Sequence, residues 1–504
     1  MFKGHPKGLF ALALANTGER FGYYTMLAVF ALFLRENFGL APGAAGAIYS
    51  TFLGLVYFMP FIGGILADKF GFGKMVTIGI SVMFLGYLLL SVPLGGDTLA
   101  MVAMIAALLF ISLGTGLFKG NLQVMVGNLY DDPKYADRRD SAFSLFYMAI
   151  NLGSLFAPTA ALSIKAWAEN SLGFSGNDAY HFSFAVACAS LILSIAIYYA
   201  FRYTFRHVEG GERKKGDVQV EDNLTPAETK SRITALVLVF AVVIFFWMAF
   251  HQNGLTLTYF ADEFTVTEAF GATTMLFNVW NLALIIVAVY ATFSIFQSEK
   301  ASGKLTSGAI ATAILGYLVY RATGSADASC AVNAPIFQQF NPFYVVALTP
   351  VSLAIFSALA KKDREPSAPR KIGLGMFVAA AGFLILALGS FGLASPKELG
   401  GTVSPVLVSP SWLISTYLVL TFAELLLSPM GISFVSKVAP PKYKGMMMGG
   451  WFAATAIGNY LVSVPGLLWM RMPLWAIWVV LIVICVVAGV FMFANMKRIE
   501  SATK

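Results

Sequence analysis

The sequence has few charged residues. Asp, Glu, Lys and Arg make up 12% of its 504 residues, whereas a soluble globular domain carries about 25%. Hydrophobic residues account for 58% and gather in long, nearly continuous runs, unlike the alternating segments of about ten residues in an outer-membrane barrel. The composition therefore excludes a soluble α/β protein and predicts an all-α polytopic membrane protein.

Cysteine and histidine are also scarce. The three cysteines, Cys188, Cys330 and Cys485, are far apart and have no metal-binding spacing, so they need form no disulfide. The sequence has no metal cluster, nucleophile elbow or phosphate loop, so we expect no enzyme and no cofactor. The net charge of +8 fits the Lys and Arg bias of short cytoplasmic loops, so we expect no nucleic-acid partner.

About fourteen apolar segments are long enough to span a bilayer. The expected spans are 8–35, 44–67, 74–95, 99–129, 141–164, 181–204, 231–261, 272–297, 305–322, 341–360, 371–394, 411–436, 446–469 and 473–496. The polar stretch 205–230 separates the first six from the rest. It predicts a cytoplasmic linker between a half at 1–204 and a half at 231–498.

Lys and Arg recur in every second loop between these segments. They begin with Lys3 and Lys7 and end with Lys497 and Arg498. Because cytoplasmic loops carry the excess of these residues, we expect both termini in the cytoplasm and the protein in a bacterial inner membrane. The first apolar run is too long for a signal peptide and has no small-residue cleavage pattern, so we expect no signal cleavage.

A charged pair, Glu19 and Arg20, lies inside the first apolar run. One ionisable side chain at the bilayer centre costs about 2.5–3.5 kcal/mol on insertion scales, so two neighbours need a functional reason. At helical spacing Arg20 and Tyr24 share one face. That face must look into the bundle or a wet cavity, which makes it a candidate transport pathway.

Other spans carry polar residues that have a structural as well as a functional interpretation. Lys119 either extends to an interface or faces a cavity, and we favour the cavity because Gly120-Asn121-Leu122-Gln123 continue the polar patch. Asn151, one turn after Tyr147, either lines the pathway or hydrogen-bonds a neighbouring helix.

The second half offers similar alternatives. His251, one turn after Trp247, either titrates near neutral pH or stays neutral as a buried donor. Glu424 is the only acid in its run, and Pro429 in the same segment is expected to bend the helix. Trp451 either lines a cavity or packs in the interior.

Several of these stretches are similar to known families. Gly63-Gly64-Ile65-Leu66-Ala67-Asp68-Lys69-Phe70-Gly71, followed by Lys74, resembles the loop signature of the major facilitator superfamily. Glu19-Arg20-Phe21-x-Tyr23-Tyr24, Phe146-Tyr147-x-x-Ile150-Asn151-x-Gly153-Ser154-Leu155 and Glu424-Leu425-x-x-Ser428-Pro429 resemble the proton-dependent oligopeptide transporter family within it. The resemblance spans nearly the whole chain. It implies the major facilitator fold, which has two six-helix halves with the substrate between them.

The resemblance also implies roles for single residues. Arg20 and Lys119 would hold the carboxylate of a di- or tripeptide, and Glu424 its ammonium group. Tyr24, Tyr57, Tyr147, Asn151 and Asn341 would bond the peptide backbone, Trp247 and Trp451 would line side-chain pockets, and Ser428 belongs to the same substrate set. Glu19, Lys119, His251 and Glu424 would carry the coupling protons.

The chain departs from the family pattern at three positions. Asn16 stands where a glutamate is usual, Leu27 where a second arginine is common, and His251 where the seventh core helix usually has a glutamate. The family is expected to pair that arginine and that glutamate across the extracellular gate. Loss of both avoids an unpaired buried charge, which would cost about 3–5 kcal/mol. The changes therefore look coordinated, and they put the usual proton route in question.

Bacterial members usually place two extra helices between the sixth and seventh core helices. The gap after Arg202 is too short and polar for them, so we expect the extra pair at about 272–322, as a peripheral hairpin. We accordingly expect a monomeric importer of di- and tripeptides, driven by protons and embedded in a lipid bilayer. The alternatives are a carrier of another small zwitterion or organic anion, and peptide transport with an altered proton route.

Overall fold

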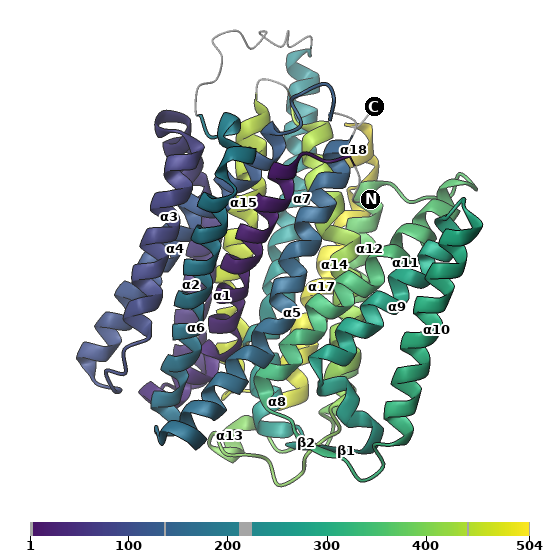
Figure 1. Ribbon diagram of the computed structural model, residues 1–504. Helices are drawn as coiled ribbons and strands as arrows, with labels where there is room; N and C mark the ends of the chain where they lie inside the picture. The colour runs from purple at the N-terminus through teal and green to yellow at the C-terminus, as the bar shows by residue number, and fades with distance from the viewer. Residues whose placement is uncertain (1–3, 136–137, 211–223, 441–442, 503–504) are drawn as a thin grey trace.

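The computed structural model describes residues 4–135, 138–210, 224–440 and 443–502, and helices packed side by side make up nearly all of it (Figure 1). Helices suit a bilayer because they satisfy every backbone hydrogen bond within the segment. The helices of the first half are α1 (Lys7–Phe38), α2 (Pro42–Phe70), α3 (Phe72–Leu90), α4 (Thr98–Asn128), α5 (Arg139–Leu172) and α6 (Gly176–Ala200).

Two short 3-10 turns, η2 (Arg202–Thr204) and η3 (Arg206–Val208), follow α6. Most of the charged part of the expected linker, 211–223, lies outside the described residues. The long helices of the second half are α7 (Pro226–Phe250), α9 (Val279–Gln297), α10 (Ala301–Thr323), α11 (Phe340–Ala360), α12 (Ala368–Gly389), α14 (Ser411–Val438), α15 (Lys444–Tyr460) and α17 (Leu474–Ala494).

Shorter elements complete the second half. They are η4 (His251–Gly254), α8 (Thr256–Phe264), β1 (Glu268–Phe270), η5 (Gly271–Phe277), β2 (Ser329–Ala331), η6 (Ala334–Gln339), α13 (Pro396–Leu399), α16 (Ser463–Leu468) and α18 (Met496–Ser501). Among the described residues, thirteen helical segments are long and apolar enough to cross a membrane, and α1, with its charged pair, is a further long helix beside them. The protein is therefore a multi-pass membrane protein, as predicted.

Local sequence signals set several of these boundaries. Asp97 caps α4 by accepting a hydrogen bond from the Ala100 amide at 2.8 Å. Thr225 and Glu228 form a capping box at the start of α7. Gly71, with φ 91°, joins α2 directly to α3 in a conformation that favours glycine.

The span expected at 231–261 is present, since one candidate membrane span runs from Pro226 to Phe264. Within this span α7 ends at Phe250 and a 3-10 turn begins at His251. At this turn Gly254 lies directly against the hydroxyl of Tyr49 from α2, which leaves no room for a side chain. Helix α14 runs without interruption from Ser411 to Val438, and the bend expected at Pro429 stays a prediction. The side chain of Pro429 is outside the description.

The arrangement places α1 near the middle of the bundle and the α9–α10 hairpin at its edge (Figure 1). Helix α1 packs against α5 and α6, whereas α10 packs mainly against α9 and has one buried residue, Ala311. The start of α1 and α18 lie at the upper end in Figure 1, and β1 and β2 lie at the lower end. The two halves meet where α2 packs on α15 and α16, and where α5 packs on α11 and η6.

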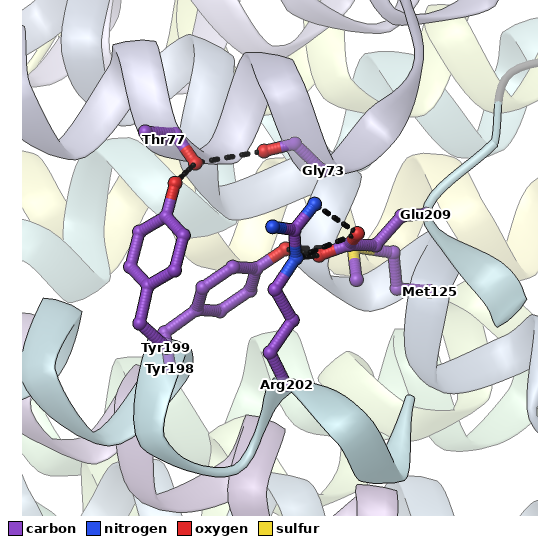
Figure 2. A network of polar contacts seen from close by, with 7 residues as sticks. All are labelled: Gly73, Thr77, Met125, Tyr198, Tyr199, Arg202 and Glu209. Carbon is purple, nitrogen blue, oxygen red and sulfur yellow. Dashed lines mark hydrogen bonds and ion pairs between the residues drawn. The ribbon is translucent and has the colours of Figure 1, made fainter. Parts of the chain in front are cut away.

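A polar network stabilises the upper end of the first half (Figure 2). The Glu209 carboxylate accepts hydrogen bonds from Tyr198 at 2.8 Å and from two Arg202 nitrogens at 2.7–2.9 Å. This hydrogen bonding raises the pKa of Arg202. The Glu209 carbonyl accepts the Gly73 amide at 3.1 Å. The network thus ties the end of α6 to the start of α3 through Glu209, which lies in the expected linker.

Candidate functional site

The charged pair of α1 is buried and its two members bind each other. Arg20 donates from Nε and Nη2 to the two carboxylate oxygens of Glu19, both at 2.5 Å, and both side chains are at most 2% exposed. The Arg20 guanidinium also lies 4.5 Å from the centre of the Tyr23 ring. A bidentate pair of this kind is the strong form of an ion pair.

Close packing fixes the position of this part of α1. Thr17 donates to the Ala149 carbonyl of α5 at 3.1 Å. A side chain at Gly153 of α5 would come within 2.9 Å of the Thr17 carbonyl, so the glycine permits the approach of the two helices. Asn151, which is buried, donates to the carbonyl of Tyr147 on its own helix at 3.0 Å. In this structure Asn151 therefore bonds its own helix, whereas the structural interpretation expected a bond to a neighbouring helix.

Glu424 is the centre of a second cluster, which joins the two halves. Its carboxylate accepts a hydrogen bond from the Tyr147 hydroxyl of α5 at 3.2 Å and another from the Asn341 amide of α11 at 3.0 Å. Asn341 also donates to the Thr421 hydroxyl at 3.1 Å. The side chain of Glu424 is 7% exposed. Among the described residues its bonded partners are neutral, so the carboxylate is free to pair with a cation.

Tyr24 and Tyr57 lie between the two clusters. Tyr24 interacts electrostatically with Arg20, Glu19 and Glu424, and Tyr57 interacts with Tyr24, Arg20 and Glu424. Both tyrosines are half-buried. The structure therefore brings the first-half charges and the second-half carboxylate to one region, with phenol groups between them.

Lys119 lies in the same region. Its ammonium group lies 4.2 Å from the centre of the Tyr57 ring, and it is within electrostatic reach of Arg20 and Glu19. No carboxylate of the described residues lies within ion-pair distance of Lys119. Among the described residues of this region, Lys119 is thus a cation without a salt bridge and Glu424 a carboxylate without a salt bridge.

A third cluster surrounds His251. Its ring stacks on Trp247 with 5.1 Å between the ring centres, and lies 6.0 Å from the centre of Tyr57. Several buried polar atoms here lack a hydrogen-bond partner, namely Nδ1 of His251, Nε1 of Trp247 and both side-chain amide atoms of Asn459. A buried polar group without a partner costs about 1–3 kcal/mol, so this cluster is suited to a ligand or to water.

Trp451, in α15, and Ser428, in α14, are the remaining predicted site residues of the second half. Trp451 is 3% exposed; its ring packs directly on Gly431 of α14 and lies 6.4 Å from the ring centre of Phe240 in α7. The hydroxyl of Ser428 is buried without a hydrogen-bond partner. The structure therefore gives Trp451 an interior packing contact, the ordinary one of its two interpretations.

Three further polar residues lie in this region or beside it and had no sequence-based prediction. Thr421 is one helical turn before Glu424, so helical spacing could have predicted that the two residues share a face. Asn459 is a lone amide in an apolar helix, and Tyr417 donates to the Asn253 carbonyl at 3.0 Å. Neither has a recognisable motif. Within the described residues, no group of three or more His, Cys, Asp or Glu side chains is placed to hold a metal ion.

Known proteins resemble this chain over nearly its whole length. The "Uncharacterized transporter YclF" of Bacillus subtilis is 31% identical over 497 residues, with 92% of this chain and 89% of that protein covered. The "Peptide transporter YePEPT" of Yersinia enterocolitica is 28% identical over 540 residues, with 100% and 97% covered. These relatives are named as transporters.

Solved structures share the fold. A crystal structure of the peptide transporter POT in complex with sulfate has a TM-score of 0.73 and 25% identity, with 100% of this chain and 96% of that chain covered. A POT family transporter in complex with 5-aminolevulinic acid has a TM-score of 0.75 at 21% identity, with 99% and 98% covered. The predicted all-α, major facilitator fold is thereby confirmed.

The family model gives the most direct assignment. The model described as POT family matches residues 73–221 and 321–469, which together make up more than half of the chain. The matched regions include Lys119, Tyr147, Asn341 and Glu424. The family resemblance expected from the sequence is confirmed, and the chain belongs to the POT family.

Proposed function

We propose that this protein imports di- and tripeptides by alternating access. The observation that carries the proposal is Glu424, a buried carboxylate with neutral partners, which accepts hydrogen bonds from both halves of the bundle. The ammonium group of a peptide would supply the cationic partner of this carboxylate. Lys119 and the Arg20–Glu19 pair lie across the same region and would receive the peptide carboxylate. Relatives named "Di-/tripeptide transporter" from Lactococcus lactis, 28–29% identical, support the same substrate class.

A zwitterion bound in this way contacts both halves at once. Its ammonium group would bind Glu424 of α14 and its carboxylate would bind Lys119 of α4. The bound peptide therefore stabilises a state in which the halves are close. This differential interaction is what a substrate needs to drive a conformational change. Asn341, Tyr147, Tyr24 and Tyr57 would contact the peptide backbone.

Protons are the coupling ion in this proposal, and no cofactor takes part. Glu19, Lys119, His251 and Glu424 are the titratable candidates, since all four belong to the region between the halves. Binding and proton transfer are linked at Glu424, because a carboxylate that accepts a proton no longer attracts an ammonium group. Asn16, Leu27 and His251 depart from the family pattern. Of these three residues only His251 can bind a proton, so the proton route would differ from the usual one at His251.

The proposed topology follows the loop charges. Residues 1–204 and 231–498 form the two halves, 205–230 the linker, and 272–322 an inserted hairpin. Both termini lie in the cytoplasm, the membrane is a bacterial inner membrane, and the protein works as a monomer. The upper end in Figure 1 is then cytoplasmic and the lower end extracellular.

Uptake of labelled dialanine into proteoliposomes, with and without an inward proton gradient, tests the proposal. We expect uptake above the passive rate, which the gradient increases and which unlabelled trialanine competes away. Thermal stabilisation by dialanine, compared with alanine and with small organic anions, tests which substrate class the protein binds, independently of transport. Stabilisation by single amino acids or anions but not by dialanine would favour the alternative, a carrier of another small zwitterion or anion.

A further inference from the structure

A cavity of about 520 Å³ lies between the first half of the bundle and the α9–α10 hairpin. One wall is α5, through Thr159, Leu162 and Ser163. The other walls are the start of α9, the end of α10 and the segment that contains β2, at the lower end of Figure 1. The volume lies within the range of about 300–1,000 Å³ that is typical of small-molecule sites. None of the substrate or proton residues predicted above lines this cavity, so it is separate from the region around Glu424.

The lining of the cavity carries a positive charge. Arg321, two residues before the end of α10, lines it, and the described residues of the lining include no aspartate or glutamate. Arg321 donates from Nη1 to the Tyr317 hydroxyl at 3.2 Å and forms no salt bridge with a described carboxylate. Asp327, six residues later, is exposed and is not part of the lining. A guanidinium has five N–H donors, so the cavity is suited to an anion.

Neutral hydrogen-bonding groups accompany this charge. Asn278 lines the cavity and caps α9, since its Oδ1 accepts the Trp280 amide at 2.9 Å. Its Nδ2 group is a separate donor. Asn333, before η6, and Ser163 of α5 add a second amide and a hydroxyl. The oxygens of a phosphate group accept such hydrogen bonds, and arginine binds phosphate through two parallel ones.

The cavity lies at the level where the hairpin leaves the bilayer. The two candidate spans of the hairpin run from Val279 to Gln297 and from Ala301 to Thr323. Asn278 and Arg321 are therefore at the lower ends of these spans. Trp280, which also lines the cavity, is 68% exposed, and tryptophan is enriched at the boundary between membrane and water. The phosphate groups of lipids lie at this level.

The surface of α10 away from this level is apolar. Leu315, Val319 and Tyr320 are 51%, 62% and 75% exposed, and α10 buries only Ala311. In a bilayer these exposed side chains contact acyl chains. A phospholipid gains from this surface and from the charged cavity together, whereas a soluble anion gains only from the cavity. Basic pockets between transmembrane helices are known to bind phospholipid headgroups.

We propose that the cavity between α5 and the α9–α10 hairpin binds the phosphate headgroup of an anionic phospholipid, with Arg321 as its cationic partner. The headgroup lies between Ser163 of α5 and Arg321 of α10, and so attaches the hairpin to the first half. Under the proposed topology the lipid belongs to the outer leaflet. The site is independent of the substrate that the protein carries.

Cys330 lines the same cavity and gives a local probe of its occupancy. It is half-buried, whereas Cys188 and Cys485 are buried, so a maleimide should react first at Cys330. The labelling rate of the full chain in detergent is measured by mass spectrometry with three added ligands. Dioctanoyl-phosphatidylglycerol should slow labelling at least threefold. Dioctanoyl-phosphatidylcholine, which has the same chains without net charge, and inorganic phosphate, which has no chains, should slow it much less.

Variants test the charge of the cavity. Arg321→Gln should raise the phosphatidylglycerol concentration for half-maximal protection roughly tenfold or more, because it removes hydrogen bonds between charged groups. Asn278→Asp keeps the cap of α9, since the two residues cap equally well, and adds a negative charge to the lining, so it should also weaken protection. Arg471→Gln, at an exposed arginine before α17 and outside the lining, is the matched control and should leave protection unchanged.

Several results would overturn the proposal. Equal protection by phosphatidylcholine would reduce the contact to acyl chains, and equal protection by phosphate would make the ligand a soluble anion. Absence of protection by phosphatidylglycerol, or wild-type protection in Arg321→Gln or Asn278→Asp, would also refute the site. An equal loss in Arg471→Gln would show that the charge acts from outside the cavity.

The comparison of the three ligands uses the wild-type protein, so it decides the proposal even where a variant fails to fold. The labelling assay also needs no transport. Absence of dialanine uptake by the wild-type protein would refute the proposed function and leave the labelling rates at Cys330 interpretable.

Discussion

Glu424 is the single buried carboxylate to which the proposal assigns the ammonium group of the substrate. Its bonded partners in the described part of the chain are the neutral side chains of Tyr147 and Asn341. Such hydrogen bonds stabilise the carboxylate without neutralising it, so it keeps the capacity to attract a cation. In a region with little water, that attraction is stronger than it would be at the surface.

Glu424→Gln should therefore weaken uptake of peptides with a free amino terminus. Loss of one partner of a buried charge pair costs about 2 kcal/mol or more, which is roughly a thirtyfold loss of affinity. Competition assays with dialanine and an N-acetylated peptide measure the effect, and the capped peptide should lose less. Glu398→Gln, at an exposed capping box, is the matched control. Equal losses for both peptides would contradict an ammonium role for Glu424.

His251→Asn should change the pH profile of uptake. His251 stacks on Trp247, and its Nδ1 lacks a partner, so it can exchange a proton without breaking a bond at that atom. Asparagine cannot take up a proton, so the part of the pH profile that His251 contributes should be missing from the variant. Uptake at fixed gradient over a series of pH values, from acidic to neutral, measures it. An identical profile would return His251 to a structural role, and His207→Asn, in an exposed turn, is the control.

Single site residues were predictable from the sequence where the residue type and its spacing within a motif identified them. Glu424, Tyr147 and Asn341 were selected from the family resemblance, and the structure places Tyr147 and Asn341 in contact with Glu424. The mutual pairing of Glu19 and Arg20 could not be predicted, because neighbours in a helix point in different directions and only their long, flexible side chains bring them together. The ion pair between Arg35 of α1 and Glu263 of α8 has no motif, and this contact depends on how the halves dock.

At the scale of single helices, the glycines of α2 have different functions. Gly63 lies directly against the Gly116 backbone of α4, so a methyl group there would force the helices apart. The next residue, Gly64, has open space around it. The sequence shows two glycines in a row, and only the structure shows which of them lies in a close helix contact.

Gly63→Ala should therefore destabilise the protein and Gly64→Ala should not. Overpacking a tight contact costs about 1–3 kcal/mol. In contrast, alanine has a higher helix propensity than glycine, so Gly64→Ala is expected to be neutral or slightly stabilising. Thermal unfolding in the same detergent compares the two neighbours directly. A lower midpoint for Gly64→Ala, or an unchanged one for Gly63→Ala, would contradict the assignment of the contact.

The positions of the helices were predictable from the apolar runs, since each expected span is largely helical in the structure. Interruptions within a run were harder to predict. Between α15 and α16 the cause is local, because Pro465 has no amide hydrogen to donate to the Leu461 carbonyl four residues earlier. At the turn that begins at His251, Gly254 lies against the hydroxyl of Tyr49 from α2, a contact that the sequence does not show.

For the whole molecule, Cys330 offers a direct test of orientation. It lies in β2 at the lower end of Figure 1 and is half-buried, whereas Cys188 and Cys485 are buried. If the lower end is extracellular, a membrane-impermeant maleimide added to intact cells should label Cys330. Desolvation raises the pKa of this thiol, so its thiolate fraction at a given pH is smaller than that of a free cysteine, and labelling should accelerate as pH rises. Cys330→Ser is the control, and labelling that requires permeabilised cells would reverse the proposed topology.

The strands β1 and β2 bracket the α9–α10 hairpin, with Glu268 opposite Ala331 and Phe270 opposite Ser329. Paired strands keep their backbones about 5 Å apart, so the chain leaves the bundle and returns to it at almost one point. A segment attached in this way adds little loop-closure cost to the remainder. An insertion of two spans could therefore enter a gene at this position, or be lost from it, without reversing the direction of any later helix.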